Sequence, residues 1–217
     1  ELGVFERFEH GPATVDDFPG FDRLAIERLL DACVSLGLLE KDGTAYRNAP
    51  VASRYLVRDS PDTMAGYILY SNEALFPMWA RLEDAVREGT NRWMPVFGFP
   101  PGELFAKHFF NTPEAMHNFL MGMHGFGQLS SPAVVAAFDL SRFRRIVDLG
   151  GGTGHLALAA IERYPGMTAA LFDLPSAIEF ARSLTGGRID LIAGDFFKDP
   201  LPPADLYALG RILHDWT

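Results

Sequence analysis

Cysteine is nearly absent from this sequence, and long hydrophobic runs are absent altogether. The single cysteine, Cys33, cannot form a disulfide within the chain, which fits a protein of a reducing compartment. No apolar run approaches the roughly 20 residues that a membrane-spanning helix needs. We therefore expect a soluble, cytoplasmic protein with no membrane segment, in which Cys33 is a small buried hydrophobe.

Basic residues are scarce relative to acidic ones. The 217 residues include 19 Lys and Arg against 28 Asp and Glu, a formal net charge of −9 at pH 7. Since phosphate groups and anionic lipids are bound by clustered cations, this balance argues against nucleic acid or a membrane surface as a partner. Hydrophobic residues make up 48% and charged residues 22%, the proportions of a globular chain, and the length allows one or two domains.

The first part of the chain contains the pattern of a helix followed by a hairpin. Apolar residues recur at helical spacing through residues 21–36, and Gly37 is a suitable residue to end the helix. Residues 38–46 then indicate two short strands around Asp42-Gly43, a dipeptide typical of hairpin turns. A helix and a small hairpin in this order predict a winged helix.

The next part of the chain is expected to be mostly helical. Two helices are predicted within residues 60–89, with Ser60-Pro61 as the first cap and Pro77 as the interruption. An ordered loop is predicted for residues 90–102, because this segment is rich in proline and aromatic residues. A third helix is predicted for residues 112–129.

The character of the sequence changes at Arg144. From there on, four apolar segments with the length of strands alternate with two segments at helical spacing. This alternation predicts an α/β fold with parallel βαβ units and a doubly wound sheet, in which ligands bind beyond the carboxyl ends of the strands. The predicted strands are 145–149, 167–172, 189–193 and 204–209, and the predicted helices are 156–164 and 175–184.

A glycine-rich turn follows the first predicted strand, with glycines at positions 150, 151, 152 and 154. Such a turn lets a ligand approach the backbone closely and exposes amides at a helix N-terminus. His155 stands where a dinucleotide-binding GxGxxG turn has its third glycine, and no Walker-type Gly-Lys-Ser/Thr follows. The turn alone therefore leaves two interpretations open, a ligand cradle and a simple tight turn.

Chemically suited side chains also follow the second and third predicted strands. Asp173 can accept the hydroxyls of a ribose, and its alternative role is to cap the helix that begins near Pro175. Asp195 can accept from an exocyclic amine, while Phe196 offers an apolar face to a base. Three successive strands, each ending in a group suited to one part of a nucleoside, predict a nucleoside site.

The fourth predicted strand runs into a segment that contains His214. An imidazole has an unperturbed pKa of about 6.5, which suits proton abstraction near neutral pH. His214 is therefore the candidate general base, with a purely structural histidine as the alternative. We expect catalysis without a metal, because the sequence has no His, Cys and Asp cluster with ligand spacing, and His108, His117 and His124 fall in a helical region.

Four motifs in this order resemble those of the class I S-adenosylmethionine-dependent O-methyltransferases of the caffeate and acetylserotonin type. They are Asp148-x-Gly150-x-Gly152-x-Gly154, Phe172-Asp173-Leu174-Pro175, Gly194-Asp195-Phe196-Phe197 and His214-Asp215-Trp216. Three further stretches are most similar to the acetylserotonin branch of that family. They are residues 87–91, 137–141 and 199–202. The similarity extends over essentially the whole chain.

The resemblance implies that S-adenosylmethionine is the cofactor and that the strand ends bind it. Gly150 would lie against the methionine part of the cofactor, and Asp173 would bind the ribose hydroxyls. Gly194 would contribute to cofactor binding, next to Asp195 and Phe196, which would hold the adenine.

The resemblance also assigns roles to the last motif. Arg211 would help to fix the cofactor, although Gly210 stands where plant members of the family often have Lys. His214 would be the general base that takes the proton of the acceptor hydroxyl, and Asp215 would border the acceptor.

A domain arrangement and a set of partners follow from the same resemblance. Residues 1–130 would form a helical, winged-helix domain for dimerisation and substrate lining. Residues 131–217 would form the first part of a Rossmann-like, cofactor-binding domain, so that the doubly wound sheet is incomplete here. A homodimer and a small, aromatic acceptor with a hydroxyl group are expected. Since the chain begins with Glu1 and stops just after the His214 motif, we expect a piece of a longer protein whose later part orients the base.

One stretch of the third helix leaves two interpretations open. His124 and its apolar neighbours either line the acceptor pocket or pack in the core or at a subunit contact. These neighbours are Met116, Phe119, Met123 and Phe126.

Two other functions are compatible with the same fold. One is a protein that binds S-adenosylmethionine but does not methylate. The other is a winged-helix regulator that binds DNA, for which residues 25–35 form a poor recognition helix because they hold few charges.

Overall fold

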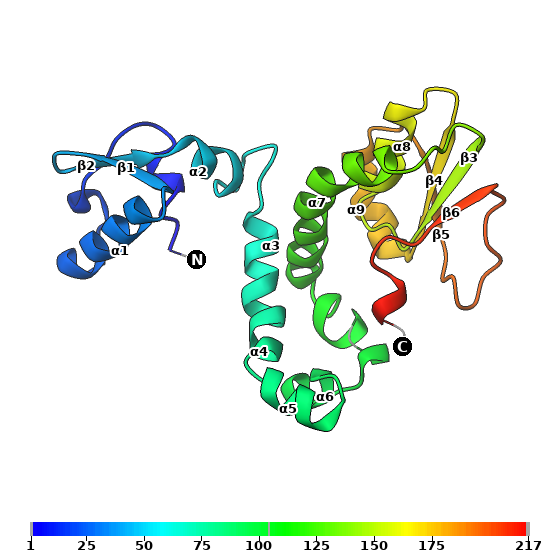
Figure 1. Ribbon diagram of the computed structural model, residues 1–217, viewed down its shortest axis with the longest axis horizontal. Coiled ribbons are helices and arrows are strands. Elements are labelled where there is room, and N and C mark those ends of the chain that lie inside the picture. The colour runs from blue at the N-terminus through cyan, green and yellow to red at the C-terminus, as the bar shows by residue number, and fades with distance from the viewer. Residues whose placement is uncertain (1, 104, 216–217) are drawn as a thin grey trace. The chain divides into compact units, whose positions relative to one another are not determined.

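The computed structural model describes residues 2–103 and 105–215, and the chain divides into two compact units (Figure 1). The first unit comprises Glu1–Ala65 and the second comprises Gly66–Thr217. Each unit buries apolar side chains in a core of its own.

The first unit is a helix followed by a two-stranded hairpin, as the sequence predicts. Helix α1 begins where the Asp22 carboxylate accepts the Ala25 N–H at 2.8 Å, and it ends before Gly37, whose φ of +72° is left-handed. The hairpin turns at Gly43, which also has a left-handed φ. The elements are η1 (Glu6–Phe8), η2 (Val15–Asp17), α1 (Arg23–Ser35), β1 (Leu39–Asp42), β2 (Ala45–Asn48) and α2 (Pro50–Tyr55).

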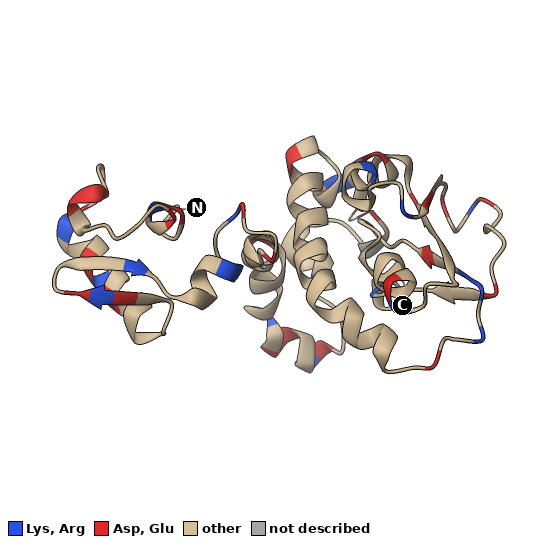
Figure 2. Ribbon diagram, turned by 90° about the horizontal axis from the view of Figure 1, so that it is seen from above, with Lys and Arg blue, Asp and Glu red and all other residues tan. Residues whose placement is uncertain are grey.

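The core of this unit joins α1 to the hairpin. Leu30 and Cys33 of α1 are buried in the same cluster as Tyr46 of β2, and burial raises the pKa of the Cys33 thiol. The predicted burial of Cys33 is therefore confirmed. The Lys41 ammonium and the Tyr46 hydroxyl both donate to the Asp31 carboxylate, at 2.7 and 2.8 Å, and they lower its pKa. Figure 2 shows acidic and basic residues interspersed on α1 and the hairpin.

The helical segment that follows is more broken than the sequence predicts. Helix α3 starts at Ala65 and not at Ser60-Pro61. Pro77 does not interrupt the helix, because the π-helical turn η3 precedes it and the Phe76 N–H reaches the carbonyl of Ser71, five residues back. The elements are α3 (Ala65–Tyr70), η3 (Ser71–Leu75), α4 (Phe76–Trp79) and α5 (Leu82–Glu88).

A short helix, α6 (Trp93–Phe97), replaces part of the loop predicted for residues 90–102. The Asn91 side chain accepts the Trp93 N–H at 3.2 Å, and the helix ends at Gly98, whose φ is +80°. The rings of Trp93 and Phe97 are in contact one turn apart, with centroids separated by 5.4 Å. The next elements are η4 (Pro101–Glu103), the π-helical turn η5 (Phe105–Phe109) and the long helix α7 (Pro113–Ala136).

The backbones of α3 and α7 come into direct contact at a pair of glycines. A Cβ atom on Gly66 would lie 2.8 Å from the Gly122 nitrogen, and one on Gly122 would lie 3.1 Å from the Gly66 oxygen. Neither position accepts a side chain without a shift of the backbone. The crossing brings Tyr70 of α3 and Phe119 of α7 together, with ring centroids 5.6 Å apart.

The rest of the second unit is an α/β fold with a four-stranded parallel sheet in the order β5-β4-β3-β6. The predicted fold class is confirmed, and so is the predicted alternation of strands and helices. The elements are β3 (Arg145–Leu149), α8 (His155–Arg163), β4 (Thr168–Asp173), α9 (Pro175–Thr185), β5 (Asp190–Ala193), β6 (Leu206–Ala208) and η6 (Leu213–Asp215).

Alternate residues of the central strands face opposite sides of the sheet. Leu171 of β4 belongs to the buried cluster that includes side chains of α8 and α9. Its neighbours Ala170 and Phe172 belong to a second cluster, with Val147 of β3 and the partly buried Phe196. This period of two is the pattern of strands that are buried on both faces.

Strand β3 lies between β4 and β6. The chain first adds β4 and β5 on one side of β3 and then adds β6 on its other side. Such a reversal is the topological switch point of a doubly wound sheet, where a ligand crevice forms outside the carboxyl ends of the strands. The glycine-rich turn directly follows β3. The fold therefore places this turn at the edge where a ligand is expected (Figure 1).

The fold leaves two expectations open. The predicted domain division at residue 130 falls inside α7, and the assignment of dimerisation to residues 1–130 and of cofactor binding to residues 131–217 stays a prediction. The cytoplasmic location also stays a prediction. Within residues 2–103 and 105–215, no helix combines the length and the apolar character needed to cross a membrane.

Candidate functional site

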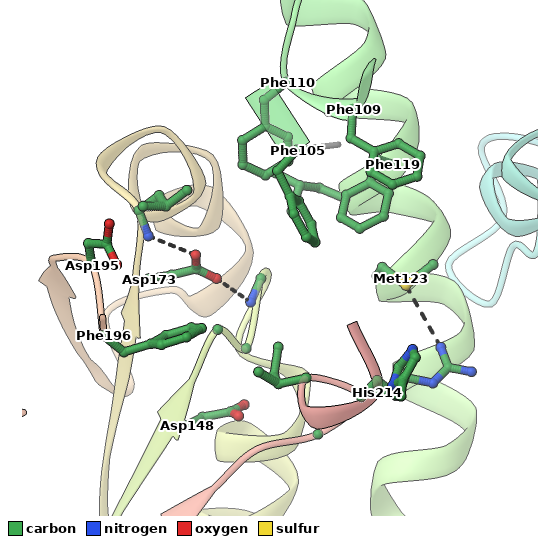
Figure 3. Close-up of a pocket in the computed structure, with 18 of the residues that line it drawn as sticks. Phe105, Phe109, Phe110, Phe119, Met123, Asp148, Asp173, Asp195, Phe196 and His214 are labelled. Atoms are coloured by element: carbon green, nitrogen blue, oxygen red, sulfur yellow. Dashed lines mark hydrogen bonds between the residues drawn. The ribbon is translucent and has the colours of Figure 1, made fainter. Parts of the chain in front are cut away.

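A cavity of about 910 Å³ lies in the second unit, at the carboxyl ends of the strands, and its lining has two parts (Figure 3). The polar end contains glycines, carboxylates and one phenylalanine that lie at the carboxyl ends of the strands or directly after them. It consists of Asp148, Gly150, Gly151, Gly152, Asp173, Gly194, Asp195 and Phe196. The aromatic end contains rings from the helical segment. It consists of Tyr67, Tyr70, Trp93, Phe105, Phe109, Phe110 and Phe119.

The glycine turn lines the cavity with backbone atoms that carry no side chains. Gly150, Gly152 and Gly154 have φ values of +69°, +60° and +77°, which side chains rarely tolerate. A Cβ atom on Gly150 would also lie 2.7 Å from Ile212 Cδ1. The turn therefore requires glycine on two grounds, conformation and space, and it leaves its backbone open to a ligand.

Asp173 is held in place by the backbone around it. Its carboxylate accepts the Gly152 N–H at 2.8 Å and the Leu174 N–H at 2.7 Å (Figure 3). Burial raises the pKa of Asp173, and the two N–H groups oppose this by favouring the charged form. The alternative role of a cap for the next helix is not met, because Leu174 is the N-cap residue and no side chain caps α9. Asp173 instead binds the Leu174 amide and one amide of the glycine turn.

Asp148 is a buried carboxylate beneath the glycine turn. The residue is 1% exposed, and neither of its oxygens has a hydrogen-bond partner among the described residues. Burial and the nearby Asp173 carboxylate raise the pKa of Asp148 to about 7, although the Ala157 N–H favours its charged form. A Cβ atom on Gly151 would overlap this carboxylate, so only glycine fits above it.

The segment after β5 adds a charged and an aromatic group to the polar end. Asp195 accepts the Phe197 N–H at 2.9 Å and forms an ion pair with Lys198 at 2.7 Å, which lowers the pKa of Asp195. A Cβ atom on Gly194 would overlap the buried Phe172 ring, so glycine is required there as well. Phe196 lines the cavity (Figure 3).

The last motif contributes a strained arginine and the candidate base. Arg211 has a φ of +62° and is the one non-glycine residue with a left-handed φ in the part of the chain that the structure describes. Its guanidinium carbon lies 3.5 Å from the centroid of the Phe126 ring, and Nη1 lies 3.8 Å from the Met123 sulfur. His214 is exposed on η6 and lines the cavity. The side chain of Asp215 lies outside the described part.

A polar network fixes the glycine turn to α7. The His124 ring accepts or donates a hydrogen bond at Nδ1 to the Thr153 hydroxyl, 2.9 Å away, and its other nitrogen meets Gln128. The His155 ring contacts the Ser131 hydroxyl at 2.8 Å. Burial lowers the pKa of His124, and burial together with neighbouring cationic groups lowers that of His155 to about 4. Both rings are thus neutral near neutral pH.

The residues around His124 on α7 were expected either to line the acceptor pocket or to pack in the core, and the structure divides them between the two. Phe119 and Met123 line the cavity. His124, Met116 and Phe126 are not among the described residues that line it. His124 instead packs against the back of the glycine turn, because Thr153 supplies the polar partner that a buried imidazole needs.

Most of the predicted site residues come together in this one cavity. They are Gly150, Asp173, Gly194, Asp195, Phe196, Arg211 and His214. Asp148 was not predicted to have a role beyond its place in a motif, and of the aromatic end only Phe119 was considered as a lining residue. A run of six residues with three phenylalanines, Phe105, Phe109 and Phe110, is the signal that could have indicated the aromatic end. Within residues 2–103 and 105–215, no group of three His, Cys, Asp or Glu side chains could hold a metal ion.

Known proteins resemble this chain over its whole length. Residues 79–217 match the O-methyltransferase domain family, and residues 1–58 match the O-methyltransferase dimerisation domain. The chain is 43% identical to acetylserotonin O-methyltransferase of Bos taurus, over 100% of this chain and 66% of that protein. It is 42% identical to a probable bifunctional dTTP/UTP pyrophosphatase/methyltransferase protein of Homo sapiens, over 88% of this chain and 32% of that protein.

A solved structure shows the same arrangement of elements. The crystal structure of human N-acetylserotonin methyltransferase in complex with SAM superimposes with a TM-score of 0.87 at 38% identity. The match covers 100% of this chain and 66% of that one. The chain thus spans about 66% of the length of these acetylserotonin-methylating relatives.

Proposed function

Since this chain belongs to the O-methyltransferase family, we propose that its cavity binds S-adenosylmethionine and that the protein transfers a methyl group to a hydroxyl of a small aromatic acceptor. The family that the sequence motifs predict is confirmed by the two domain matches. The observation that carries the proposal is the polar end of the cavity, where three strand ends bring a glycine turn and three carboxylates together. The human relative solved in complex with SAM supports the choice of cofactor.

The residues of the polar end fit such a ligand. The bare backbone at Gly150 and Gly152 admits a close approach, and Asp173 keeps lone pairs for ribose hydroxyls beyond the two amides it already binds. Phe196 offers a flat apolar surface to an adenine, and Asp195 offers a carboxylate to its amino group. Each of these roles is the one that the family resemblance implies.

His214 is the proposed general base. S-adenosylmethionine, when bound, supplies a methyl group that its sulfonium already activates. This chain then has to align the acceptor and take its proton, and the imidazole of a residue that lines the cavity suits that task. Arg211 would hold the cofactor from the same segment, and Asp215 would border the acceptor.

The aromatic end supports a planar acceptor. Its rings are stacked or edge-on to one another, as between Phe109 and Phe119, whose centroids are 4.4 Å apart. A flat, largely apolar ring would extend this packing, and its hydroxyl would then face the charged groups of the polar end. Relatives named for acetylserotonin point to hydroxyindoles as the first acceptors to try, with simple phenols beside them.

A homodimer is the proposed assembly. Residues 1–58 match a dimerisation domain, and this supports pairing through the first unit. The mixed charges on α1 give no support to the alternative of a DNA-binding regulator (Figure 2).

Methyl-labelled S-adenosylmethionine tests the proposal directly. The intact protein that contains this chain is incubated with the label and a panel of hydroxyindoles, phenols and aliphatic alcohols. We expect label in an aromatic product, and we expect His214→Gln to bind the cofactor without forming that product. Binding without any transfer across the panel would instead identify a cofactor-binding protein that does not methylate. No binding of the cofactor would overturn the whole proposal.

A further inference from the structure

Arg211 lines the cavity and has no carboxylate partner in the part of the chain that the structure describes. Lys198, another cation of the lining, is paired with Asp195 at 2.7 Å. The Arg211 guanidinium instead lies over the Phe126 ring, with its carbon 3.5 Å from the ring centroid, and Nη1 lies 3.8 Å from the Met123 sulfur (Figure 3). The cation is therefore held in place without being neutralised.

Phe126 lies behind Arg211 and is itself packed between two helices. It belongs to α7, is partly buried, and its ring centroid lies 5.3 Å from that of Tyr67 on α3. Phe126 is not among the described residues that line the cavity. Its connection to the site is therefore its contact with Arg211.

The backbone of Arg211 depends on contacts of this kind. Its φ of +62° is left-handed, and a residue with a side chain keeps such a conformation only where its surroundings support it. Phe126 and Met123 both belong to α7 and both contact the guanidinium group. Helix α7 thus supports the conformation in which the Arg211 side chain reaches the cavity.

The contact with Phe126 leaves the N–H groups of Arg211 available to a ligand. A carbon atom 3.5 Å from a ring centroid is in van der Waals contact with the face of that ring, so the guanidinium uses its own flat face there. Its N–H groups lie in the plane of the group and point away from the ring. The charge of Arg211 is also felt at the glycine turn, because it helps to lower the pKa of His155, which directly follows that turn.

We propose that Phe126 is a positioning residue, which holds the Arg211 guanidinium so that its N–H groups bind the carboxylate of the cofactor. The inference rests on the proposed function, because it takes S-adenosylmethionine as the ligand. At neutral pH the carboxylate is the anionic group of that molecule, since its ammonium and sulfonium groups are cationic and its ribose and adenine are uncharged. A guanidinium binds a carboxylate through two parallel N–H groups, so its orientation matters as much as its charge.

Two ligands and one substitution test this by calorimetry on the intact protein. S-adenosylmethionine and its decarboxylated form share the sulfonium, the ammonium, the ribose and the adenine, and only the first has the carboxylate. We expect Phe126→Leu to weaken S-adenosylmethionine about 2–5-fold, the size of an exposed cation–π contact, and to leave the decarboxylated form within about 1.5-fold. Phe126→Tyr keeps a flat ring and should restore the affinity.

Phe180→Leu is the matched control for Phe126→Leu. Phe180 is also partly buried in the second unit, its ring lies 5.4 Å from that of His117, and it is not among the described residues that line the cavity. This variant should change neither affinity. Arg211→Lys makes the same test at an exposed residue, without a change in α7. It keeps the charge but lacks the planar group, so it should weaken S-adenosylmethionine and spare the decarboxylated form.

A double-mutant cycle shows whether Phe126 acts through Arg211. Arg211→Ala should weaken S-adenosylmethionine about 10–150-fold, the size of a hydrogen bond between charged groups. In the Arg211→Ala protein, Phe126→Leu should then have no further effect. Losses that add in the double variant, or equal losses for both ligands in Phe126→Leu and in Arg211→Lys, would overturn the inference and leave the proposed function intact. Failure of the unsubstituted protein to bind S-adenosylmethionine would remove the proposed function itself.

Discussion

The two ends of the cavity are built in different ways. The polar end uses residues at the carboxyl ends of strands and directly after them, so their positions come from the sheet and from the turn of Gly150–Gly154. The aromatic end uses rings from several helical elements that hold one another, as Phe105 and Phe119 do with centroids 5.7 Å apart. The strands thus determine which polar groups face the cavity, whereas the packing of the rings determines the shape of its aromatic end. Substitutions at the two ends should therefore separate cofactor binding from acceptor binding.

The largest effect is expected on turnover, for a substitution at His214 that leaves the binding surfaces of both ends unchanged. His214→Gln removes the proposed base, and we expect turnover to fall about 10²–10⁴-fold, because general base assistance has this size. Calorimetry should give an unchanged affinity for S-adenosylmethionine. Turnover equal to that of the unsubstituted protein would remove His214 from the mechanism.

At the polar end, Asp148→Asn should increase the stability of the protein without ligand. Its ordinary pKa is about 3.9 in an unfolded chain and is raised to about 7 in the fold. The folded state therefore binds more protons between these values, and stability from this group is lost as the pH rises towards 7. We expect a gain on the order of 2–4 kcal/mol at pH 8 and little change at pH 4.

Urea unfolding of both proteins at the two pH values measures this gain. Asp190→Asn, whose carboxylate is exposed, is the control and should show no such difference. A gain of equal size at both pH values would show that the substitution acts through packing and not through the charge.

Asp173→Asn should weaken the cofactor through the same end of the cavity. The substitution removes the charge from a group that binds two amides and, in our proposal, the ribose. Since hydrogen bonds to a charged group contribute about 1.5–3 kcal/mol, we expect roughly 10–150-fold weaker binding of both S-adenosylmethionine and S-adenosylhomocysteine. The KM for the acceptor, measured with saturating cofactor, should stay the same, and a change confined to that KM would contradict the assignment.

Gly127→Ala tests the support behind the polar end. A Cβ atom at this position would overlap the ring of His155, which Ser131 holds at 2.8 Å. We expect a loss of about 1–3 kcal/mol in the free energy of unfolding, as for other overpacked sites. The double variant with His155→Ala should recover most of this loss. No recovery would mean that the strain lies elsewhere in α7.

The smallest effect is expected at the aromatic end. Phe119→Leu keeps an apolar side chain but loses ring contacts with Phe109 and Tyr70. Aromatic pairs contribute about 0.5–1.5 kcal/mol, so the KM for the acceptor should rise about 2–10-fold. Cofactor affinity should not change. A loss of cofactor affinity as large as that of the acceptor would show that the two ends are not separate.

The same comparison explains how far the sequence could predict this molecule. The strands and the turn at the polar end follow from local patterns, so the α/β fold and the grouping of Asp173, Asp195 and His214 in one cavity could be foreseen. Their individual roles stay predictions. The isolation of Asp148 could not be foreseen, because it depends on which donors the folded chain brings near it.

The aromatic end of the cavity could not be predicted from the sequence for a different reason. Two π-helical turns, η3 and η5, change the direction of the side chains that follow them, and neither has a periodic sequence signal. The sequence also could not predict which residues of α7 line the cavity. His124 and Phe119 share a helix, but which of them faces the cavity depends on what α7 packs against.

The glycine pair Gly66 and Gly122 sets how closely α3 and α7 approach each other. Tyr70 follows Gly66 on one helix and Phe119 precedes Gly122 on the other, so the separation of the helix axes sets the gap between these two rings. A single methyl group at the crossing would spread the axes and move the two rings apart. In the proposed function, the thickness of the acceptor would therefore depend on a position that touches no bound molecule.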